Sequence, residues 1–417
     1  MTALISLIER EPNQPITLAE TDIVKVDGQS VDIPVSVVFQ LYPSPRVVIE
    51  SDTLSDLAHM GNRLEIVLRN GARLDVRVGT LYFNPEKTIL IPASQPTNVI
   101  DKDLPLKEVS FAILNLPEFY GQQDKMIGDA EQWVRIPHAK LKAADWWIEI
   151  TGVPNIGEIA KTLKRSSGHG ITYNGSITRS GGTTFFARDV EPLLEALRFF
   201  LSIARGAACS LALVRGKDEM SQDSWVRWGA HNSEPWLDYH SAFPRVHSNI
   251  LSDLFPEFWN LLTGKEDRRD AILRAFDWYL QSNVSAPYIG TILTFAALEA
   301  LSFLLARNGS DRKRIETVLS NMQIPLNLPK NCESLRFLRN WDTGPQTLVA
   351  IRSNLIHPQK SLSGISNLDY WEAWHLGQWY FELMLLSWLG YQGCYRNRLA
   401  TMQGNEELVV SVPWAPR

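Results

Sequence analysis

The stretch Pro345-Gln-Thr-Leu-Val-Ala-Ile-Arg-Ser-Asn-Leu-Ile-His-Pro358 predicts a short helix that stops at a defined residue. The proline that opens it suits the first turn of a helix, and Thr343 or Gly344 precedes it as the cap. Pro358 disfavours the α conformation in the residue before it, so the helix is expected to end at His357.

Two side chains of this stretch, Arg352 and His357, suit the cleavage of a phosphodiester. On a straight helix, residues five apart point about 140° from each other, so a break at His357 frees its imidazole to turn back toward the guanidinium. Arginine can fork onto a phosphate, and histidine can take or give a proton near neutrality. RNA supplies its own 2′-hydroxyl as the nucleophile, so no metal or other cofactor is required.

The sequence around this stretch is helical from residue 250 onward. Ile272, Ala275, Phe276, Tyr279 and Leu280 fall at the spacing of one helix face. Further helices are expected from 287, over 311–322 and over 370–389. Residues 286–306 are long and apolar enough to span a membrane, but a glutamate near the centre favours a buried helix of a protein without a membrane segment.

The first half of the chain follows a β pattern instead. Turn signals at Asp27-Gly28, Asn70-Gly71 and Asn174-Gly175 each separate alternating apolar residues, as in tight hairpins. Strands are also expected at 1–8, 88–91, 108–114 and 146–150, and a helix at about 191–204. We therefore predict an α+β protein in which a β-rich domain, 1–240, resembling a sandwich or open barrel, precedes an all-α bundle, 241–417.

Bulk properties narrow the function classes. A net charge of −5 gives no overall basic field, so any contact with RNA must come from a local patch. The three cysteines, Cys209, Cys332 and Cys394, form no CxxC pair, which argues against a zinc site or disulfide framework and favours a reducing cytoplasm.

The segment Ile351-Arg-Ser-Asn-Leu-Ile-His-Pro358 resembles the Arg-polar-x-x-x-His motif of the HEPN superfamily. The two-part layout, and the closing stretch Gly390-Tyr-Gln-Gly-Cys-Tyr-Arg-Asn-Arg-Leu399, resemble large bacterial HEPN proteins of the ApeA-like phage-defence type. The resemblance covers about the last 40% of the chain. It implies a metal-independent endoribonuclease whose Arg352 holds the scissile phosphate, whose His357 is the general acid or base, and whose composite site forms in a homodimer.

Other residues are candidates for supporting roles. Ser353 and Asn354 occupy the polar positions after the arginine, and Glu299, in an otherwise apolar helix, needs a partner, with Arg352 as the first choice and His357 as the second. A basic rim that binds RNA is predicted from Arg312, Lys313, Arg314, Arg396 and Arg398.

Two classes of function are therefore open. One is a HEPN ribonuclease in antiviral defence or toxin-like RNA cleavage, triggered or restrained through the N-terminal domain or by an inhibitor protein. The alternative is a non-catalytic HEPN module that binds nucleotides or proteins and dimerises, with the β-rich domain as the receptor for a ligand or partner.

Overall fold

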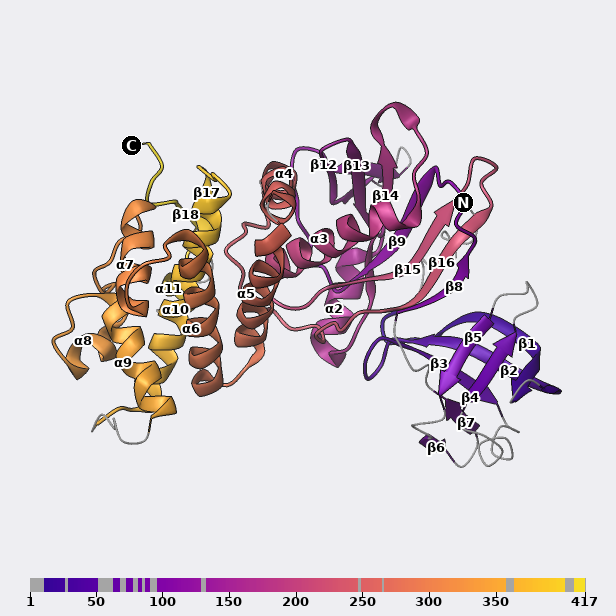
Figure 1. Ribbon diagram of the computed structural model, residues 1–417, viewed down its shortest axis with the longest axis horizontal. Helices are drawn as coiled ribbons and strands as arrows, with labels where there is room; N and C mark the ends of the chain where they lie inside the picture. Colours follow the sequence, from indigo (N-terminus) through magenta and orange to yellow (C-terminus); the bar gives the residue numbers. More distant parts are fainter. Residues whose placement is uncertain are drawn as a thin grey trace. The chain divides into compact units, whose positions relative to one another are not determined.

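The computed structural model describes most of the chain (Figure 1). The described residues are 11–26, 29–51, 63–67, 73–77, 82–84, 87–90, 96–128, 133–246, 249–264, 266–357, 364–401 and 409–416. They fall into two compact units, which we call the β-rich unit (1–198 with 209–237) and the helical unit (199–208 with 238–417). The units divide near the predicted boundary at 240, with the segment 199–208 belonging to the helical unit.

The first sheet of the β-rich unit is antiparallel, with the strand order β5-β4-β1-β2-β3-β7-β6. Its strands are β1 (Ile16–Val26), β2 (Gln29–Gln40), β3 (Arg46–Ser51), β4 (Arg63–Val67), β5 (Arg73–Arg77), β6 (Tyr82–Asn84) and β7 (Lys87–Leu90). Antiparallel pairs join β1 to β2 and β4 to β5, as the first two turn signals predicted. Those turns, and the strand predicted at 1–8, lie outside the described residues.

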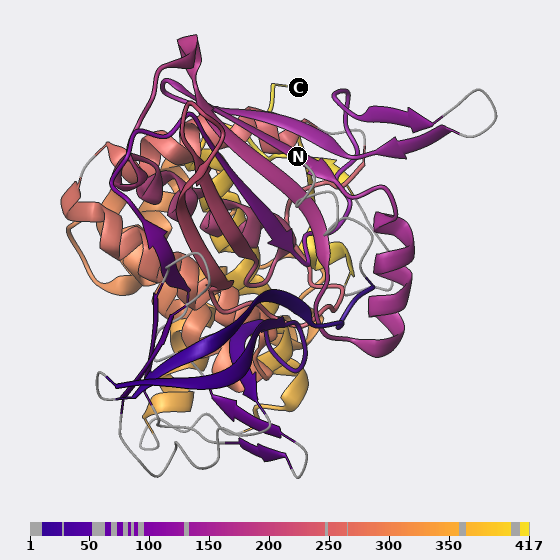
Figure 2. The same ribbon diagram turned by 90° about the vertical axis from the view of Figure 1, so that its right-hand side faces the viewer.

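The second sheet is also antiparallel and has the order β12-β13-β14-β9-β15-β16-β8. Its strands are β8 (Thr97–Asp101), β9 (Glu108–Leu114), β12 (His138–Ala143), β13 (Trp146–Gly152), β14 (Ile171–Arg179), β15 (Ser210–Lys217) and β16 (Asp223–Ala230). A separate hairpin and three helical segments accompany it: β10 (Lys125–Gly128), β11 (Trp133–Ile136), α2 (Ile156–Ser166), η1 (Ser180–Gly182) and α3 (Ala187–Arg205). Figure 2 shows the β10–β11 hairpin as a ribbon that projects from these strands.

The predicted hairpin at Asn174-Gly175 is wrong, because β14 runs through both residues as one strand. Gly175 pairs with Phe111 of β9, and a Cβ atom added to it would lie 2.3 Å from the Phe111 ring. The glycine is therefore needed for the close approach of an aromatic ring, a use of glycine within strands that a turn signal does not distinguish.

The helical unit contains nearly all of the remaining elements. They are α4 (Ile250–Thr263), α5 (Glu266–Val284), α6 (Pro287–Leu305), α7 (Asp311–Asn321), α8 (Glu333–Leu338), α9 (Gly344–Ile356), α10 (Asn367–Trp388), β17 (Cys394–Arg396), α11 (Arg398–Thr401) and β18 (Val409–Ser411). The β-rich and helical halves of the predicted α+β fold are confirmed, whereas the paired strands β17 and β18 depart from an all-α bundle.

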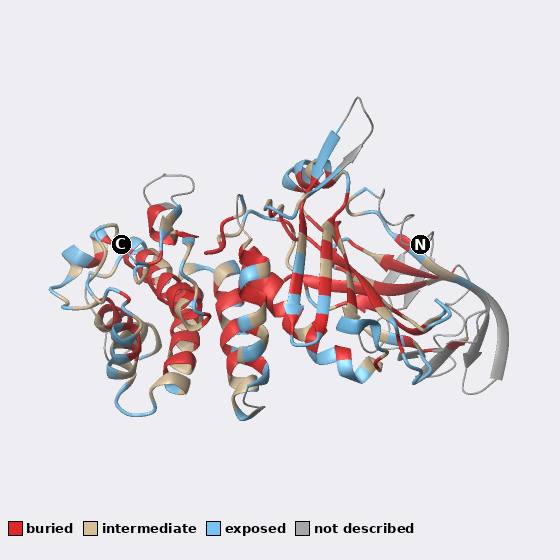
Figure 3. Ribbon diagram, turned by 90° about the horizontal axis from the view of Figure 1, so that it is seen from above, coloured by how far each residue is buried: buried red, intermediate tan, exposed pale blue. Residues whose placement is uncertain are grey.

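The core of the helical unit is aromatic. The Phe200 ring from the end of α3 packs within 5.7 Å of the rings of Phe243, Phe255 and Phe258, which explains why residues 199–208 belong to this unit. Buried positions concentrate on the inner faces of the helices and exposed ones on the outer faces (Figure 3). α6 has the length and apolar composition of a membrane span, and α5, α7, α9 and α10 all pack against it.

Candidate functional site

The helix α9 begins and ends where its sequence predicts. The Thr343 side chain accepts a hydrogen bond from the Gln346 backbone N–H at 3.2 Å, which caps the first turn. At the other end His357 leaves the helical conformation, with φ −124° and ψ 92°, while its N–H still donates to the carbonyl of Ser353 at 3.0 Å. Pro358, the residue from which this end was predicted, lies outside the described residues.

Arg352 is half-buried between α9 and α6. Its guanidinium lies over the ring of Phe295, with 5.3 Å between Cζ and the ring centroid. Phe295 is 3% exposed, so the cation rests on a fixed aromatic face rather than on a mobile side chain. Four residues further along α6 stands Glu299, whose carboxylate attracts the same guanidinium. The arginine is therefore oriented by a ring and a charge from one neighbouring helix.

Glu299 has a second cation as its ion-pair partner. Its Oε1 lies 3.6 Å from Nη2 of Arg314, which also binds Asp311. Burial and the nearby Asp311 raise the pKa of Glu299 above its usual value, while Arg352 and Arg314 act in the opposite direction. The predicted association of Glu299 with Arg352 is thus present through charge, and the ion pair itself is made with Arg314.

His357 is exposed, and the structure records no hydrogen bond between its side chain and Arg352 within the described part of α9 and its neighbours. The two residues that follow Arg352 are used differently. Ser353 provides the carbonyl that holds the His357 N–H, and the side-chain amide of Asn354 donates to the hydroxyl of Tyr370 at 2.7 Å. One chain thus brings a fixed arginine and an accessible imidazole to the same end of α9.

Sequence reasoning missed two aromatic residues next to this helix end. Tyr370, at the start of α10, receives the hydrogen bond from Asn354 and packs its ring 4.8 Å from that of Tyr288 on α6. The Tyr288 hydroxyl donates to the side chain of Asn367. Helical spacing gives a signal for one of them, because Tyr288, Phe295 and Glu299 recur at intervals of seven and four along one face of α6.

The basic residues predicted on α7 are largely paired. Arg312 donates to Glu316 at 2.8 Å, and Arg314 binds Asp311 and the carbonyl of Gly309. Lys313 is exposed. Only Lys313 among these three presents its charge to solvent without an ion pair in the described residues.

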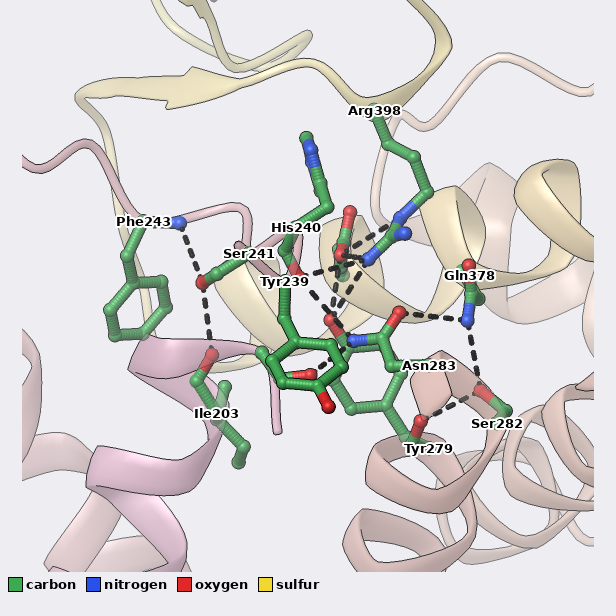
Figure 4. A network of polar contacts seen from close by, with 12 residues as sticks. Ile203, Tyr239, His240, Ser241, Phe243, Tyr279, Ser282, Asn283, Gln378 and Arg398 are labelled. Carbon is green, nitrogen blue, oxygen red and sulfur yellow. Dashed lines mark hydrogen bonds and ion pairs between the residues drawn. The ribbon is translucent and has the colours of Figure 1, made fainter. Parts of the chain in front are cut away.

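The two remaining members of the predicted basic rim, Arg396 and Arg398, are buried, at 7% and 3% exposure. Their inclusion in an exposed RNA-binding rim is therefore wrong. Arg398 donates to Oε1 of Glu382, with 3.1 Å from its Nε, and the Tyr279 hydroxyl donates to the same oxygen at 2.6 Å (Figure 4). The ion pair with Glu382 inside the helical unit accounts for the burial of Arg398.

The polar cluster extends across the interior of the helical unit. Asn283 donates to the carbonyls of Gly206 and His240, and Gln378 donates to Asn283 and to Ser282 (Figure 4). Burial, then Arg398, lower the pKa of His240 well below its usual value. Because this network joins α5, α10, α11 and the segment before α4 in the interior, its role is structural.

No group of three or more His, Cys, Asp or Glu residues that could hold a metal ion occurs in the described residues. The free cysteines differ in exposure: Cys209 and Cys332 are buried, and Cys394 is exposed. Burial raises the pKa of the Cys332 thiol to about 12, so it stays protonated and unreactive at neutral pH.

Comparisons with known proteins find two matching family models. Residues 101–239 match the YopA central domain, and residues 265–409 match the YopA C-terminal domain. The chain is 27% identical over 304 residues to the SPbeta prophage-derived uncharacterized protein YopA of Bacillus subtilis (strain 168). This match spans 67% of the chain and just under two thirds, 66%, of that relative's length. No solved structure matches the chain.

Proposed function

We propose that the protein is a metal-independent endoribonuclease of HEPN type, with its active centre at the end of α9. The observation that supports this function is the contrast between two side chains at the end of α9. Arg352 is held on Phe295 under the attraction of Glu299, while His357 stands exposed where the helix ends. A cation with a fixed direction and an imidazole with freedom to turn are the two groups that this reaction needs.

In the proposed reaction, Arg352 binds the non-bridging oxygens of the scissile phosphate and stabilises the charge that grows on them. The substrate's 2′-hydroxyl attacks phosphorus and loses its proton, and the bond from phosphorus to the 5′-oxygen breaks. His357 takes the proton from the 2′-hydroxyl or gives one to the leaving 5′-oxygen. A second imidazole, from another copy of the chain, takes the complementary role. The products end in a 2′,3′-cyclic phosphate and a 5′-hydroxyl.

The need for two imidazoles motivates a homodimer. A two-fold axis beside the end of α9 would place two Arg352 and two His357 side chains around one RNA strand. The β-rich unit, or a separate inhibitor protein, would then control whether the two copies meet. A prophage carries the YopA relative of Bacillus subtilis, according to its name. This setting suits the proposed toxin-like or antiviral role in the cytoplasm.

The test is cleavage of single-stranded RNA by the purified full-length protein in the presence of a chelator. His357→Ala and Arg352→Ala are each expected to lower the rate by about 100-fold or more, the usual contribution of a general acid or base. Arg188→Ala is the matched control, since the Arg188 guanidinium also lies over an aromatic ring, that of Phe186, but in the β-rich unit. Equal rates in all four proteins would exclude α9 as the active centre.

A second candidate function is a non-catalytic binding and dimerisation module whose β-rich unit receives a ligand or partner protein. Exposed apolar side chains on the β10–β11 hairpin favour it: Met126 is 54%, Trp133 60% and Val134 48% exposed. Such side chains are common at protein interfaces. A protein that dimerises and binds a partner through Trp133, yet leaves RNA intact, would establish this function instead of the nuclease.

A further inference from the structure

One face of α6 links the candidate active centre to an exposed aromatic ring. Tyr288, Phe295 and Glu299 lie on this face at helical spacing. Phe295 supports the guanidinium of Arg352, and Tyr288 stands seven residues toward the N-terminus. At the rise of an α-helix this separation is about 10 Å, which neighbouring nucleotides of an extended strand can bridge.

Tyr288 is both exposed and held in place. It is 42% exposed in the first turn of α6, next to Ile289, which is 56% exposed. Its hydroxyl is bound to Asn367, and its ring packs against Tyr370 at a tilt of 58°. The side-chain amide of Asn354 on α9 in turn donates a hydrogen bond to the hydroxyl of Tyr370. The ring therefore has few conformations to lose when a planar ligand stacks on it.

We propose that Tyr288 is a stacking platform for a nucleobase of single-stranded RNA, next to the nucleotide whose phosphate Arg352 holds. This proposal rests on the proposed nuclease function and names a further residue that contacts its substrate. Aromatic side chains bind bases of single strands in this way because every base has a π face. Tyr370 is a positioning residue in this arrangement, since it connects the ring of Tyr288 to Asn354 beside the catalytic pair.

A purely structural role for Tyr288 predicts something different. In that case the hydroxyl bond to Asn367, which ties the start of α6 to the start of α10, would be the important contact. Tyr288→Phe removes this bond and keeps the ring, whereas Tyr288→Ala removes both. RNA binding should follow the ring, and thermal stability should follow the hydroxyl bond, so the two variants separate the roles.

The experiment measures binding of a short single-stranded RNA that carries 2-aminopurine and is 2′-O-methylated to prevent cleavage. Full-length Tyr288→Ala is expected to bind about 5- to 100-fold more weakly than the wild type and to lose the quenching of 2-aminopurine, as befits one lost base stack. Tyr288→Phe is expected to keep both. Trp133→Ala, which removes a 60% exposed aromatic ring from the β-rich unit, is the control and should bind as the wild type does.

The outcomes distinguish this proposal from the function on which it rests. If the wild type cleaves RNA while Tyr288→Ala retains its affinity and quenching, the platform is overturned and the nuclease stands. Equal losses in Tyr288→Ala and Trp133→Ala would also overturn it, since they would report general aromatic adhesion. If the wild type neither binds nor cleaves RNA, the nuclease proposal fails, and the platform fails with it.

Discussion

The carboxylate of Glu299 lies where burial and a neighbouring acid raise its pKa, and it attracts the arginine proposed to bind phosphate. The Glu299 carboxylate forms an ion pair with Arg314 and is also attracted by the charge of Arg352. Burial and Asp311 nevertheless outweigh both cations and raise the pKa of Glu299. A site that keeps an unfavourable charge beside a candidate catalytic residue is typical of functional positions, where activity and stability compete.

Glu299→Gln is expected to raise the melting temperature at pH 7 and to lower RNA cleavage. Between the ordinary pKa of 4.5 and the raised value, the folded chain holds more protons than the unfolded chain, so wild-type stability falls as pH rises through this window. The variant lacks this loss, and the two proteins should converge in stability below pH 4.5. Thermal melts across pH, with cleavage rates at pH 7, check both halves.

Glu316→Gln is the matched control, and it is expected to lower the melting temperature at pH 7. Burial alone would raise the pKa of Glu316. Hydrogen bonds from Arg312 and Thr343 nevertheless hold this pKa below its usual value. Its carboxylate therefore stabilises the fold at neutral pH, and this contribution is lost on acidification through the lowered pKa. A Glu299→Gln variant that is less stable than the wild type at pH 7 would show that the charge of Glu299 does not destabilise the fold.

The candidate site could be predicted from sequence only where its determinants are local. The end of α9 at His357 was predictable because a neighbouring proline causes it, and the structure confirms that end. Tyr370 could not be found, because its contact with Asn354 depends on how α10 packs. Arg398 was misassigned for a related reason: a charged side chain suggests exposure unless its buried partner, Glu382, is known.

At the scale of elements, Asn174-Gly175 shows how one dipeptide serves two purposes. Asn-Gly commonly closes a hairpin because both residues tolerate positive φ. Here the pair lies inside β14, and Gly175 instead gives room to the ring of Phe111 across the sheet. The extent of β9 was predictable from its own residues, because a short and mostly apolar run has the length of a buried strand. Whether a strand turns or continues at such a dipeptide therefore depends on its cross-strand partner.

Gly175→Ala is expected to destabilise the β-rich unit by about 1–3 kcal/mol, the usual cost of overpacking a core. Its Cβ would lie 2.3 Å from the ring of Phe111, which is fully buried and cannot move aside. Denaturant titration measures the loss. Phe111→Leu combined with Gly175→Ala should cost less than the two single changes together, because the leucine relieves the clash.

Gly157→Ala provides the comparison within the same unit. Its added Cβ would meet only Glu118 Oε1, at the ordinary distance of 3.5 Å, and alanine favours the helix α2 in which it lies. This variant should be as stable as the wild type or slightly more so. A Gly175→Ala protein that unfolds at the wild-type denaturant concentration would show that the ring of Phe111 does not require the glycine.

For the whole molecule, the change of period along the chain was enough to predict a β-rich part followed by a helical one. The interior of the helical part was not predictable, since its polar network joins residues distant in sequence. Tyr279 and Glu382, which share a hydrogen bond, are separated by 103 residues. The aromatic contribution of Phe200 likewise comes from a helix that begins in the other unit. Contacts of this kind depend on how elements distant in sequence pack together.

His375 on α10, whose ring packs against Trp371 and Trp374, should make the helical unit sensitive to acid. Burial, and then the charge of Arg398, lower the pKa of His375 to about 3 from an ordinary 6.5. Between these values the unfolded chain binds a proton that the folded chain does not, so stability rises with pH across the window and is lost on acidification. A single such group changes the unfolding free energy by up to about 1.4 kcal/mol per pH unit.

His375→Gln should therefore flatten the pH dependence of unfolding between pH 6.5 and pH 3, because it removes one of the protons bound on unfolding. Denaturant titrations followed by helical circular dichroism measure the slope. His240, whose pKa is also lowered, remains in this variant, so part of the acid sensitivity persists. Equal slopes in the variant and the wild type would mean that the interior near Arg398 admits a charged imidazole.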